Sequence, residues 1–339
     1  MTTPRPRLDL FVDSPRLVSK KCRTSTPLLR PPKPPKKSST KQQHLRRSSY
    51  GYVENYSRLY NQFDIICKIG SGDFADVYQA KSLIDGKYYA IKRTTLPFSS
   101  NSDRLRKLQE VRNHQLLPPH PNCVRYYDSW EEDNFLYIQT ELCKRSLNDI
   151  LESSDDHKLP EQVVWGYMFD LLYAVKHLHD HDLIHMDIKP DNIFISFDGI
   201  AKLGDFGLMC SFLDLNSSTI TTDTDMSSRS DESTDSIDEG DSKYLASEAM
   251  QGKFTKAVDI FSLGITIFEV ASGLELPKRG KVYHKLRHNE IEDLYFNGLS
   301  ADLVKVIKLM MEEDYTKRPT INDLLELDVI HSKKLRFIP

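Results

Sequence analysis

Three polar residues stand between two short apolar runs in the stretch IHMDIKPDNIFI, residues 184–195. Asp187, Lys189 and Asn192 are two and three positions apart, which predicts a site on a short loop rather than an ordinary turn. The carboxylate of Asp187 could accept the proton of an attacking hydroxyl, and the ammonium of Lys189 could neutralise charge on a transferring phosphoryl group. The amide oxygen of Asn192 is a hard ligand that suits Mg²⁺.

A second candidate metal ligand lies in LGDFG, thirteen residues after Asn192, where Asp205 carries a carboxylate. Phosphoryl transfer requires little from a protein beyond positioning and charge stabilisation. The two stretches together therefore predict magnesium-assisted phosphoryl transfer, with Asn192 and Asp205 as metal ligands.

A turn with two glycines occupies IGSGDFADV, residues 69–77. Gly70 and Gly72 would let a strand-turn-strand backbone approach phosphates and offer N–H groups without side-chain obstruction. The pattern departs from G-x-G-x-x-G because Ala75 fills the third glycine position. Two glycines alone more often mark an ordinary hairpin, so this interpretation depends on the residues that follow.

Two charged residues follow the glycine turn at positions that could serve a nucleotide. Lys92 ends the apolar run of YAIK, and an ammonium with apolar neighbours needs an anion, which nucleotide phosphates would supply. Glu110 comes eighteen residues later on the predicted helix RLRKLQEVRN, where it could pair with Lys92. Taken singly, each residue is more often a surface charge.

The elements that must position these residues change in type along the chain. Short β-rich runs separated by Gly-containing turns cover residues 63–94, a helical pattern covers 102–117, and strands return over 123–142. From residue 161 helices dominate, and the apolar positions of 161–180 follow helical spacing. This order predicts an α+β fold with a strand-rich lobe followed by a helical lobe.

The first 50 residues differ from the rest in charge and composition. They hold 13 Lys/Arg, two Asp and eight of the 17 prolines, so this head is near +11 and the remainder near −14. A basic arm could contact nucleic acid, an anionic membrane or an acidic partner. The sequence contains no basic patch interleaved with aromatic residues, so nothing in it favours nucleic-acid binding. The composition predicts a disordered basic tail over residues 1–55.

Residues 211–243 interrupt the helical half with 14 Ser/Thr, nine acidic and two basic residues. A long loop inside a compact domain is usually functional or disordered. One hypothesis is a regulatory insertion that upstream kinases phosphorylate, and the alternative is a tolerated surface insertion.

The five cysteines show no C-x-x-C spacing, which argues against a disulfide framework and a zinc site. The first ten residues lack the apolar core of a signal peptide. The most apolar stretch, residues 260–271, contains Glu269 and is shorter than the roughly 18 apolar residues of a membrane span. We therefore expect no transmembrane segment and a soluble protein of the nucleus, the cytoplasm or both.

The motifs together resemble the protein-kinase signature set in type, order and spacing. Further along, YLASEAM resembles the A-P-E element, with Ser247 in place of Pro and Glu248 retained. VDIFSLG resembles the helix whose aspartate, here Asp259, braces the catalytic loop, and Arg318 in KRP matches the usual partner of Glu248. The resemblance implies a two-lobed protein-kinase fold over residues 60–331, with an N-lobe at 60–141 and a C-lobe at 146–331.

The kinase resemblance also implies ATP and Mg²⁺ as cofactors and assigns roles to particular residues. The catalytic residues would be Asp187 and Lys189, and the metal ligands Asn192 and Asp205. The implied nucleotide-binding residues are Ile69, Gly70, Gly72, Val77, Lys92, Glu110, Glu141 and Cys143.

Several longer stretches are similar to the Wee/Myt family of kinases that inhibit cyclin-dependent kinases. They include SWEEDNFLYIQTELC, LPEQVVWGYMFDLLYAVKHLHDHDLIHMDIKPDNIFI and FSLGITIFEVASGLELP. QTELC, from Gln139 to Cys143, and GDFGL favour the Myt-like branch. The resemblance implies phosphorylation of the Tyr, and in the Myt branch also the adjacent Thr, in the glycine-rich loop of a cyclin-dependent kinase–cyclin complex. That modification would block entry into mitosis.

Met186 stands where many kinases carry an Arg that pairs with a phosphate on the activation loop. Without that cation, loop phosphorylation has no partner at this position. The residue favours a kinase that is active without this switch, as in the Wee/Myt group. The alternative is that Met186 merely packs under the loop while another cation takes the role.

Other features leave open which kinase this is. Myt-like proteins carry a membrane-anchoring segment after the kinase domain, whereas this sequence stops at KKLRFIP, so we do not expect membrane tethering. Kinases of translation initiation factor 2 share some segments but generally keep the Arg that Met186 replaces. Ala75 and Ser247 would also fit a binding-only pseudokinase. Three Ser/Thr-Pro pairs in the tail suggest feedback phosphorylation by the cyclin-dependent kinase.

Overall fold

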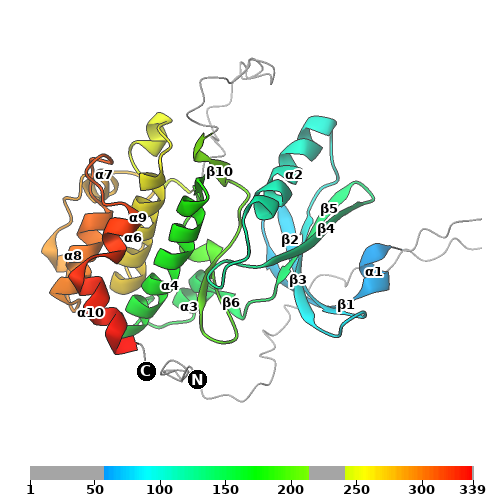
Figure 1. Cartoon of the computed structure of the whole chain (residues 1–339), viewed down its shortest axis with the longest axis horizontal. Helices are drawn as coiled ribbons and strands as arrows, with labels where there is room; N and C mark the ends of the chain where they lie inside the picture. Colours follow the sequence, from blue (N-terminus) through cyan, green and yellow to red (C-terminus); the bar gives the residue numbers. More distant parts are fainter. Residues whose placement is uncertain (1–56, 214–240, 338–339) are drawn as a thin grey trace, which may run out of the picture. The chain divides into compact units, whose positions relative to one another are not determined.

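The computed structural model describes residues 57–213 and 241–337 in two compact units (Figure 1). The strand unit comprises the described residues 57–98 and 128–140, and the helical unit comprises 99–127, 141–213 and 241–337. The predicted basic tail and most of the predicted insertion at 211–243 lie outside the described residues.

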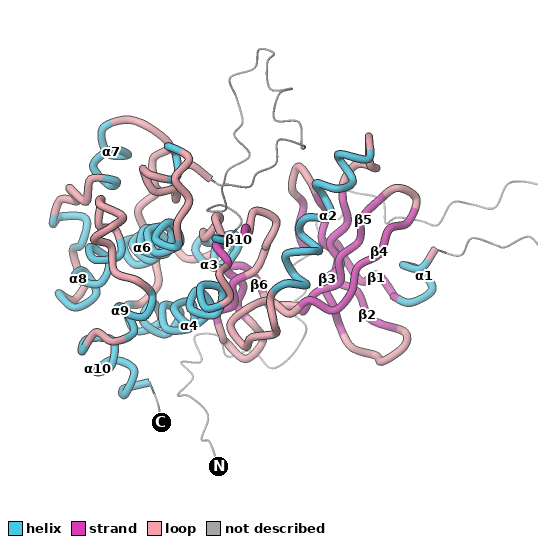
Figure 2. The backbone as a smooth tube through the Cα atoms, turned by 45° about the horizontal axis from the view of Figure 1, so that its top comes forward, coloured by secondary structure: helices cyan, strands magenta, loops and turns pink. Residues whose placement is uncertain are grey.

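The strand unit is built on a five-stranded sheet in the order β1-β2-β3-β5-β4, drawn in magenta in Figure 2. The strands are β1 (Phe63–Ser71), β2 (Ala75–Ser82), β3 (Tyr88–Thr94), β4 (Tyr126–Glu132) and β5 (Phe135–Glu141), preceded by α1 (Arg58–Gln62). β1 pairs with β2, and β2 with β3, in antiparallel register. Asp133 and Asn134 both have positive φ, as the two-residue turn between β4 and β5 requires.

One face of this sheet carries an aromatic core. Phe63, Trp130 and Tyr137 stack with ring centroids 5.9 and 5.1 Å apart. Leu59 of α1 joins this core, and the guanidinium of Arg58 lies 4.6 Å from the Trp130 ring centroid. Because side chains alternate along a strand, Tyr89 and Ile91 of β3 enter this core and their neighbour Lys92 belongs to the other face.

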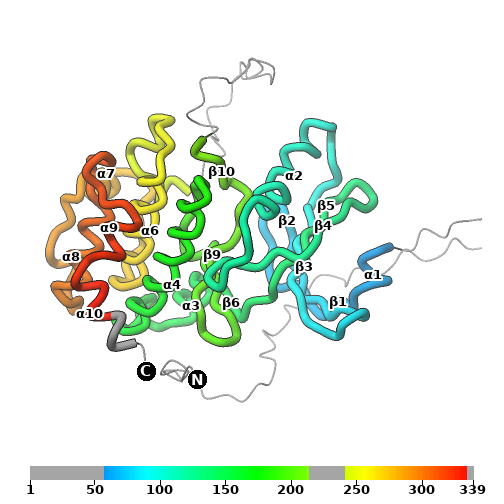
Figure 3. The backbone as a smooth tube through the Cα atoms, viewed as in Figure 1, coloured from blue at the N-terminus to red at the C-terminus, as the bar shows by residue number. Residues whose placement is uncertain are grey.

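The helical unit is dominated by two long buried helices. Its main helices are α2 (Asn101–Leu116), α3 (Leu147–Glu152), α4 (Glu161–Asp180), α6 (Lys256–Ser272), α7 (Lys281–Arg287), α8 (Ala301–Met310), α9 (Ile321–Leu325) and α10 (Asp328–Phe337). α4 coincides with the predicted helix, and its apolar stripe is buried apart from the half-buried Tyr167. α6 packs against α4 and α8, while α9 and α10 pack against α4 (Figure 3). The antiparallel sheet and this helical unit confirm the predicted α+β class.

The contact between α6 and α8 depends on a glycine. A Cβ atom at Gly264 would lie 2.7 Å from the Cβ of Met310, closer than two side chains can approach. The missing side chain therefore lets the two helices pack closely around the core.

Short elements carry the loops between the helices. They are β6 (Arg145–Ser146), β7 (Leu183–Ile184), η1 (Pro190–Asn192), β8 (Ile193–Ile195), β9 (Ala201–Leu203), β10 (Cys210–Ser211), η2 (Ala249–Gln251) and η3 (Asp293–Phe296). β6, β8 and β9 form one small sheet, and β7 pairs with β10 in another. Among the described residues, no helix is long and apolar enough to cross a membrane.

Candidate active site

The predicted loop residues come together in the helical unit. β7 leads into the loop, and η1 and β8 lead out of it. Lys189 Nζ lies 3.0 and 2.8 Å from the two carboxylate oxygens of Asp187. Asn192 Nδ2 donates to Asp187 Oδ2 at 2.7 Å and to the Asp187 carbonyl at 2.9 Å. The three side chains therefore form one polar cluster around the carboxylate.

Asp259 of α6 holds this loop from within the core. Its fully buried carboxylate accepts the main-chain N–H groups of His185 and Met186 at 2.9 and 3.0 Å. Its Oδ2 atom also lies 3.0 Å from His179 Nε2. These bonds hold Met186 at φ 71°, a left-handed conformation that is uncommon for a residue other than glycine. The predicted bracing of the loop by Asp259 is confirmed.

The side chain of Met186 packs in an apolar cluster and is 7% exposed. Its buried neighbours in the cluster are Ile184, Leu245, Ala249 and Val258. Leu245 and Ala249 follow the predicted insertion in sequence, so apolar packing joins the loop of Met186 to this later segment. Independence from loop phosphorylation stays a prediction.

The DFG residues are fixed by a different set of contacts. Phe206 is fully buried between the rings of His114 and His185, with centroids 5.0 and 5.4 Å away. Asn113 Nδ2 donates to the carbonyls of Phe206 and Met209 at 2.7 and 2.8 Å. Sequence reasoning missed Asn113 and His114, because no motif marks a side chain that binds carbonyls over 90 residues away.

The two candidate metal ligands lie on adjoining segments. The N–H of Gly204, which precedes Asp205, donates to the Asn192 carbonyl at 2.9 Å. Because Asn192 Nδ2 is bonded to Asp187, the amide oxygen is the end of this side chain that could bind a cation. A carboxylate and an amide oxygen suit Mg²⁺, which usually takes one or two protein ligands and completes its shell with phosphates and water. The residues present therefore fit this metal.

The glycine turn and Lys92 belong to the strand unit. The turn joins β1 to β2, with Gly70 opposite Val77 and the Gly72 N–H donating to the Ala75 carbonyl at 2.9 Å. Ile69 precedes it, half-buried, on β1. Lys92 is the register partner of Val77 across the β2–β3 pair.

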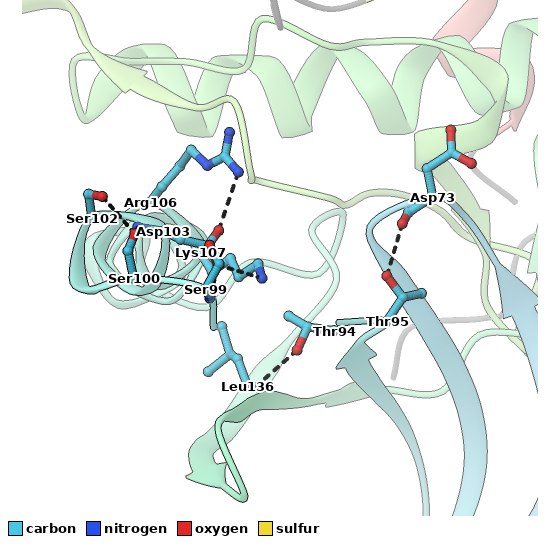
Figure 4. A network of polar contacts seen from close by, with 10 residues as sticks. All are labelled: Asp73, Thr94, Thr95, Ser99, Ser100, Ser102, Asp103, Arg106, Lys107 and Leu136. Atoms are coloured by element: carbon cyan, nitrogen blue, oxygen red, sulfur yellow. Dashed lines mark hydrogen bonds and ion pairs between the residues drawn. The ribbon is translucent and has the colours of Figure 1, made fainter. Parts of the chain in front are cut away.

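The end of β3 supports the tip of this hairpin. Thr95 Oγ1 donates to the Asp73 carbonyl at 2.9 Å (Figure 4). The Thr95 N–H donates to the Phe74 carbonyl at 3.0 Å. Thr94 Oγ1 accepts the N–H of Leu136 at 3.2 Å. The glycine turn is thus tied to the strand that carries Lys92.

Three further predicted nucleotide-binding residues, Glu110, Glu141 and Cys143, lie in the helical unit. Glu110 lies on α2, and Ser100 and Asp103 cap the first turn of this helix (Figure 4). The Ser99 N–H donates to the Asp103 carboxylate and holds its pKa well below the usual range. The Glu141 carboxylate binds Lys202 Nζ at 3.0 Å, so this side chain has a partner within the protein. Burial raises the pKa of the Cys143 thiol to about 12, which makes it a poor nucleophile.

The described residues from Asp241 onward, which include the end of the predicted insertion, contact the loop of Asp187 directly. The main-chain N–H of Asp241 donates to Asp187 Oδ1 at 3.3 Å. Tyr244 Oη donates to Glu269 Oε2 of α6 at 2.7 Å, and burial raises the Glu269 pKa to about 7. Arg318 Nη1 lies 2.5 Å from Glu248 Oε1 in a buried pair, which confirms the predicted partnership. Sequence reasoning missed Asp241 and Tyr244, since their partners come from distant elements.

Comparison with known proteins places these residues in a family context. Residues 63–330 match the family model described as protein kinase domain. The membrane-associated tyrosine- and threonine-specific cdc2-inhibitory kinase wee-1.3 of Caenorhabditis elegans is 39% identical over 333 residues, 98% of this chain and 45% of the relative. The membrane-associated tyrosine- and threonine-specific cdc2-inhibitory kinase of Drosophila melanogaster is 39% identical over 264 residues, 78% of this chain and 46% of the relative.

A probable protein kinase of Dictyostelium discoideum is 38% identical over 279 residues, 80% of this chain and 74% of that protein. The chain spans about half the length of the two cdc2-inhibitory relatives. The predicted resemblance to cdc2-inhibitory kinases is confirmed, and assignment to the Myt-like branch stays a prediction.

Proposed function

Because the chain belongs to the protein kinase family, we propose that it transfers the γ-phosphoryl group of ATP to a hydroxyl of a protein substrate. The observation that carries the proposal is the cluster of Lys189 and Asn192 around the Asp187 carboxylate. ATP and Mg²⁺ are the cofactors that a protein kinase domain uses generally.

In this mechanism Asp187 orients the attacking hydroxyl and accepts its proton, and Lys189 stabilises negative charge on the transferring group. Asn192 and Asp205 would hold Mg²⁺, which supplies charge neutralisation at the phosphates when bound. The Asn192 amide would serve both roles, since its nitrogen donates to Asp187 and its oxygen would be a ligand of the metal. The bonds from Asp259 keep the loop rigid, which limits the reorganisation needed at the moment of reaction.

The strand unit would hold the nucleotide. Main-chain N–H groups of the turn at Gly70 and Gly72 would cradle phosphates, and Ile69 and Val77 would line the adenine side. Lys92 would bind the phosphates. In the helical unit, Glu110 and residues 141–143 have the nucleotide-binding roles that the kinase resemblance implies. These roles come from the kinase resemblance and from the residue types at each position.

We propose a cyclin-dependent kinase, in complex with a cyclin, as the substrate. The support is the similarity to the two relatives, which are named tyrosine- and threonine-specific cdc2-inhibitory kinases. The modified residues would be the Tyr, and in a Myt-like kinase the adjacent Thr, of the substrate's glycine-rich loop. The protein would then restrain entry into mitosis and work in the nucleus, the cytoplasm or both.

The test uses purified protein, Mg-ATP and a catalytically dead cyclin-dependent kinase–cyclin complex, followed by phosphosite mapping. We expect phosphate on the glycine-loop Tyr, reduced about 10²–10⁴-fold by Asp187→Asn because the proton acceptor is lost. Asp180→Asn is the matched control, since this exposed carboxylate of α4 pairs only with Lys176 in the described structure.

The outcomes separate the alternatives. Phosphate on Thr as well as Tyr would support the Myt-like branch. Transfer to generic proteins but not to the complex would contradict the substrate, and it would leave a kinase of another class, such as an initiation-factor-2 kinase. No transfer to any protein would support a binding-only pseudokinase.

A further inference from the structure

Arg287 of α7 is an unusual buried cation. It is 2% exposed and is the largest of the fully buried side chains among the described residues. Its guanidinium donates only to main-chain carbonyls, those of Tyr283 at 3.2 Å, Lys243 at 3.2 Å and Ser242. Within the described residues no carboxylate forms an ion pair with it, and its Nε atom has no hydrogen-bond partner.

Burial lowers the Arg287 pKa to about 10, so the guanidinium remains charged at neutral pH. A buried charge without a counter-ion opposes folding unless other interactions compensate for its lost hydration. The compensation here is the set of carbonyl dipoles together with the ring of Tyr283, whose centroid lies 3.5 Å from the guanidinium carbon. Two of those three carbonyls belong to one turn, Ser242 and Lys243.

That turn, Asp241–Tyr244, is held by hydrogen bonds within itself and from α6 and α7. The Tyr244 N–H donates to the Asp241 carbonyl at 2.9 Å, and the Lys243 N–H donates to Asp241 Oδ1 at 3.0 Å. Ser262 Oγ of α6 donates to the Tyr244 carbonyl at 3.0 Å. From α7, Tyr283 Oη donates to the Ser242 carbonyl at 3.3 Å, beside the bonds from Arg287.

These bonds place the turn where it contacts the Asp187 carboxylate. The Asp241 N–H, one residue before the carbonyl that Arg287 and Tyr283 hold, donates to Asp187 Oδ1. Lys189 and Asn192 already direct donors to this carboxylate from within the loop. Among the described residues, Asp241 supplies the donor from outside the loop, so its position decides whether this donor reaches the carboxylate.

We propose that Arg287 is a positioning residue that holds the turn Asp241–Tyr244 against Asp187, so that the carboxylate is oriented for the accepting hydroxyl of a protein substrate. The inference rests on the proposed kinase function for its catalytic consequence. The structural part of the inference is that the Arg287 guanidinium holds the turn through hydrogen bonds to its carbonyls, and this part is independent of the kinase function. Arg is required rather than Lys, because its planar guanidinium can bind several carbonyls at once.

The first experiment measures hydrogen exchange of a peptide that spans residues 241–244 in the wild type and in Arg287→Met. We expect faster exchange in the variant, because the turn loses its bonds from α7. Lys285→Met is the matched control, since this exposed cation on the same helix pairs with Glu292 and should leave exchange unchanged. Equal protection of the turn in the wild type and Arg287→Met would overturn the proposal whatever the protein catalyses.

The second experiment measures steady-state kinetics with a protein substrate and, separately, binding of Mg-ADP. Arg287→Met should lower kcat by about 10–100-fold, the effect of a small displacement at a reacting group, with the Kd for Mg-ADP unchanged. The kcat of Arg287→Lys should lie between those of the wild type and Arg287→Met. Tyr283→Phe keeps the guanidinium, so its kcat should fall less than that of Arg287→Met.

The two readouts distinguish misfolding and a wrong function from a wrong inference. An equal fall in kcat and in the fraction of protein that binds Mg-ADP would mean simple misfolding and would overturn the positioning role. An unchanged kcat would overturn it as well. Absence of phosphoryl transfer by the wild type would contradict the proposed function, while the exchange experiment would still decide whether Arg287 holds the turn.

Discussion

Two buried arginines hold the described segment from Asp241 to Glu248, and they differ in how their charge is balanced. Arg318 binds the Glu248 carboxylate through Nη1 and also donates to the carbonyls of Ala257 and Glu312. Arg287 binds only carbonyls, near the start of the same segment. Both guanidinium groups also lie over an aromatic ring.

The difference indicates two distinct roles. Removal of either partner of a buried ion pair leaves an uncompensated charge, so the pair at Glu248 and Arg318 ties the segment's end to the core. Among the described residues, Arg287 leaves no opposite charge behind when it is removed, and it fixes the position of two carbonyls beside the loop of Asp187. We therefore expect stability to depend on Arg318 and geometry at Asp187 to depend on Arg287.

The largest expected effect is that of Arg318→Met on the free energy of unfolding. The variant leaves the buried Glu248 carboxylate unpaired, which should reduce stability by about 3–5 kcal/mol in urea unfolding. The double variant Glu248→Met/Arg318→Met should recover part of this loss, because no buried charge remains. A loss of stability below about 1 kcal/mol for the single variant would contradict the role assigned to Arg318.

A smaller effect is expected from Glu269, which binds Tyr244 between the two arginine contacts. Burial, with Asp191 and Asp241 nearby, raises the Glu269 pKa from 4.5 to about 7, although the Tyr244 hydroxyl and Lys243 oppose this shift. Between these values the folded protein holds a proton that the unfolded chain releases, so stability should fall as pH rises. The fall amounts to about 3 kcal/mol and should end above about pH 7.

Glu269→Gln tests this assignment in unfolding experiments at several pH values. Gln can still accept the Tyr244 hydroxyl but does not titrate, so the slope of stability against pH should flatten between about 4.5 and 7. An unchanged slope would assign the pH dependence to another group.

The smallest expected effect on stability is that of Arg287→Met. The variant loses the bonds to the Ser242 and Lys243 carbonyls but also removes a buried charge that has no counter-ion among the described residues, and the two contributions oppose each other. We expect a change of about 1 kcal/mol or less in urea unfolding, together with the loss of kcat proposed above. A destabilisation as large as that of Arg318→Met would erase the distinction between the two arginines.

Predictions from the sequence succeeded where the signal lies within a short stretch. The helix at 161–180 follows from its apolar spacing, and the α+β order follows from the change of pattern along the chain. Asp187, Lys189 and Asn192 lie within six residues on a loop with apolar flanks, so chain geometry alone keeps them close. Glu248 and Arg318 are far apart in sequence and were paired only through the kinase resemblance.

The sequence by itself determined the chemistry of the loop, because residue type and local spacing already limit which groups can meet there. Only the tertiary structure decided which distant groups complete it. In the sequence, Glu269 is a charge that interrupts an apolar stretch. In the structure it is a half-buried residue of α6 that accepts the hydrogen bond of the Tyr244 hydroxyl. Arg287 carries no motif, because its partners are main-chain carbonyls, which every residue has, and only packing selects those of Ser242 and Lys243.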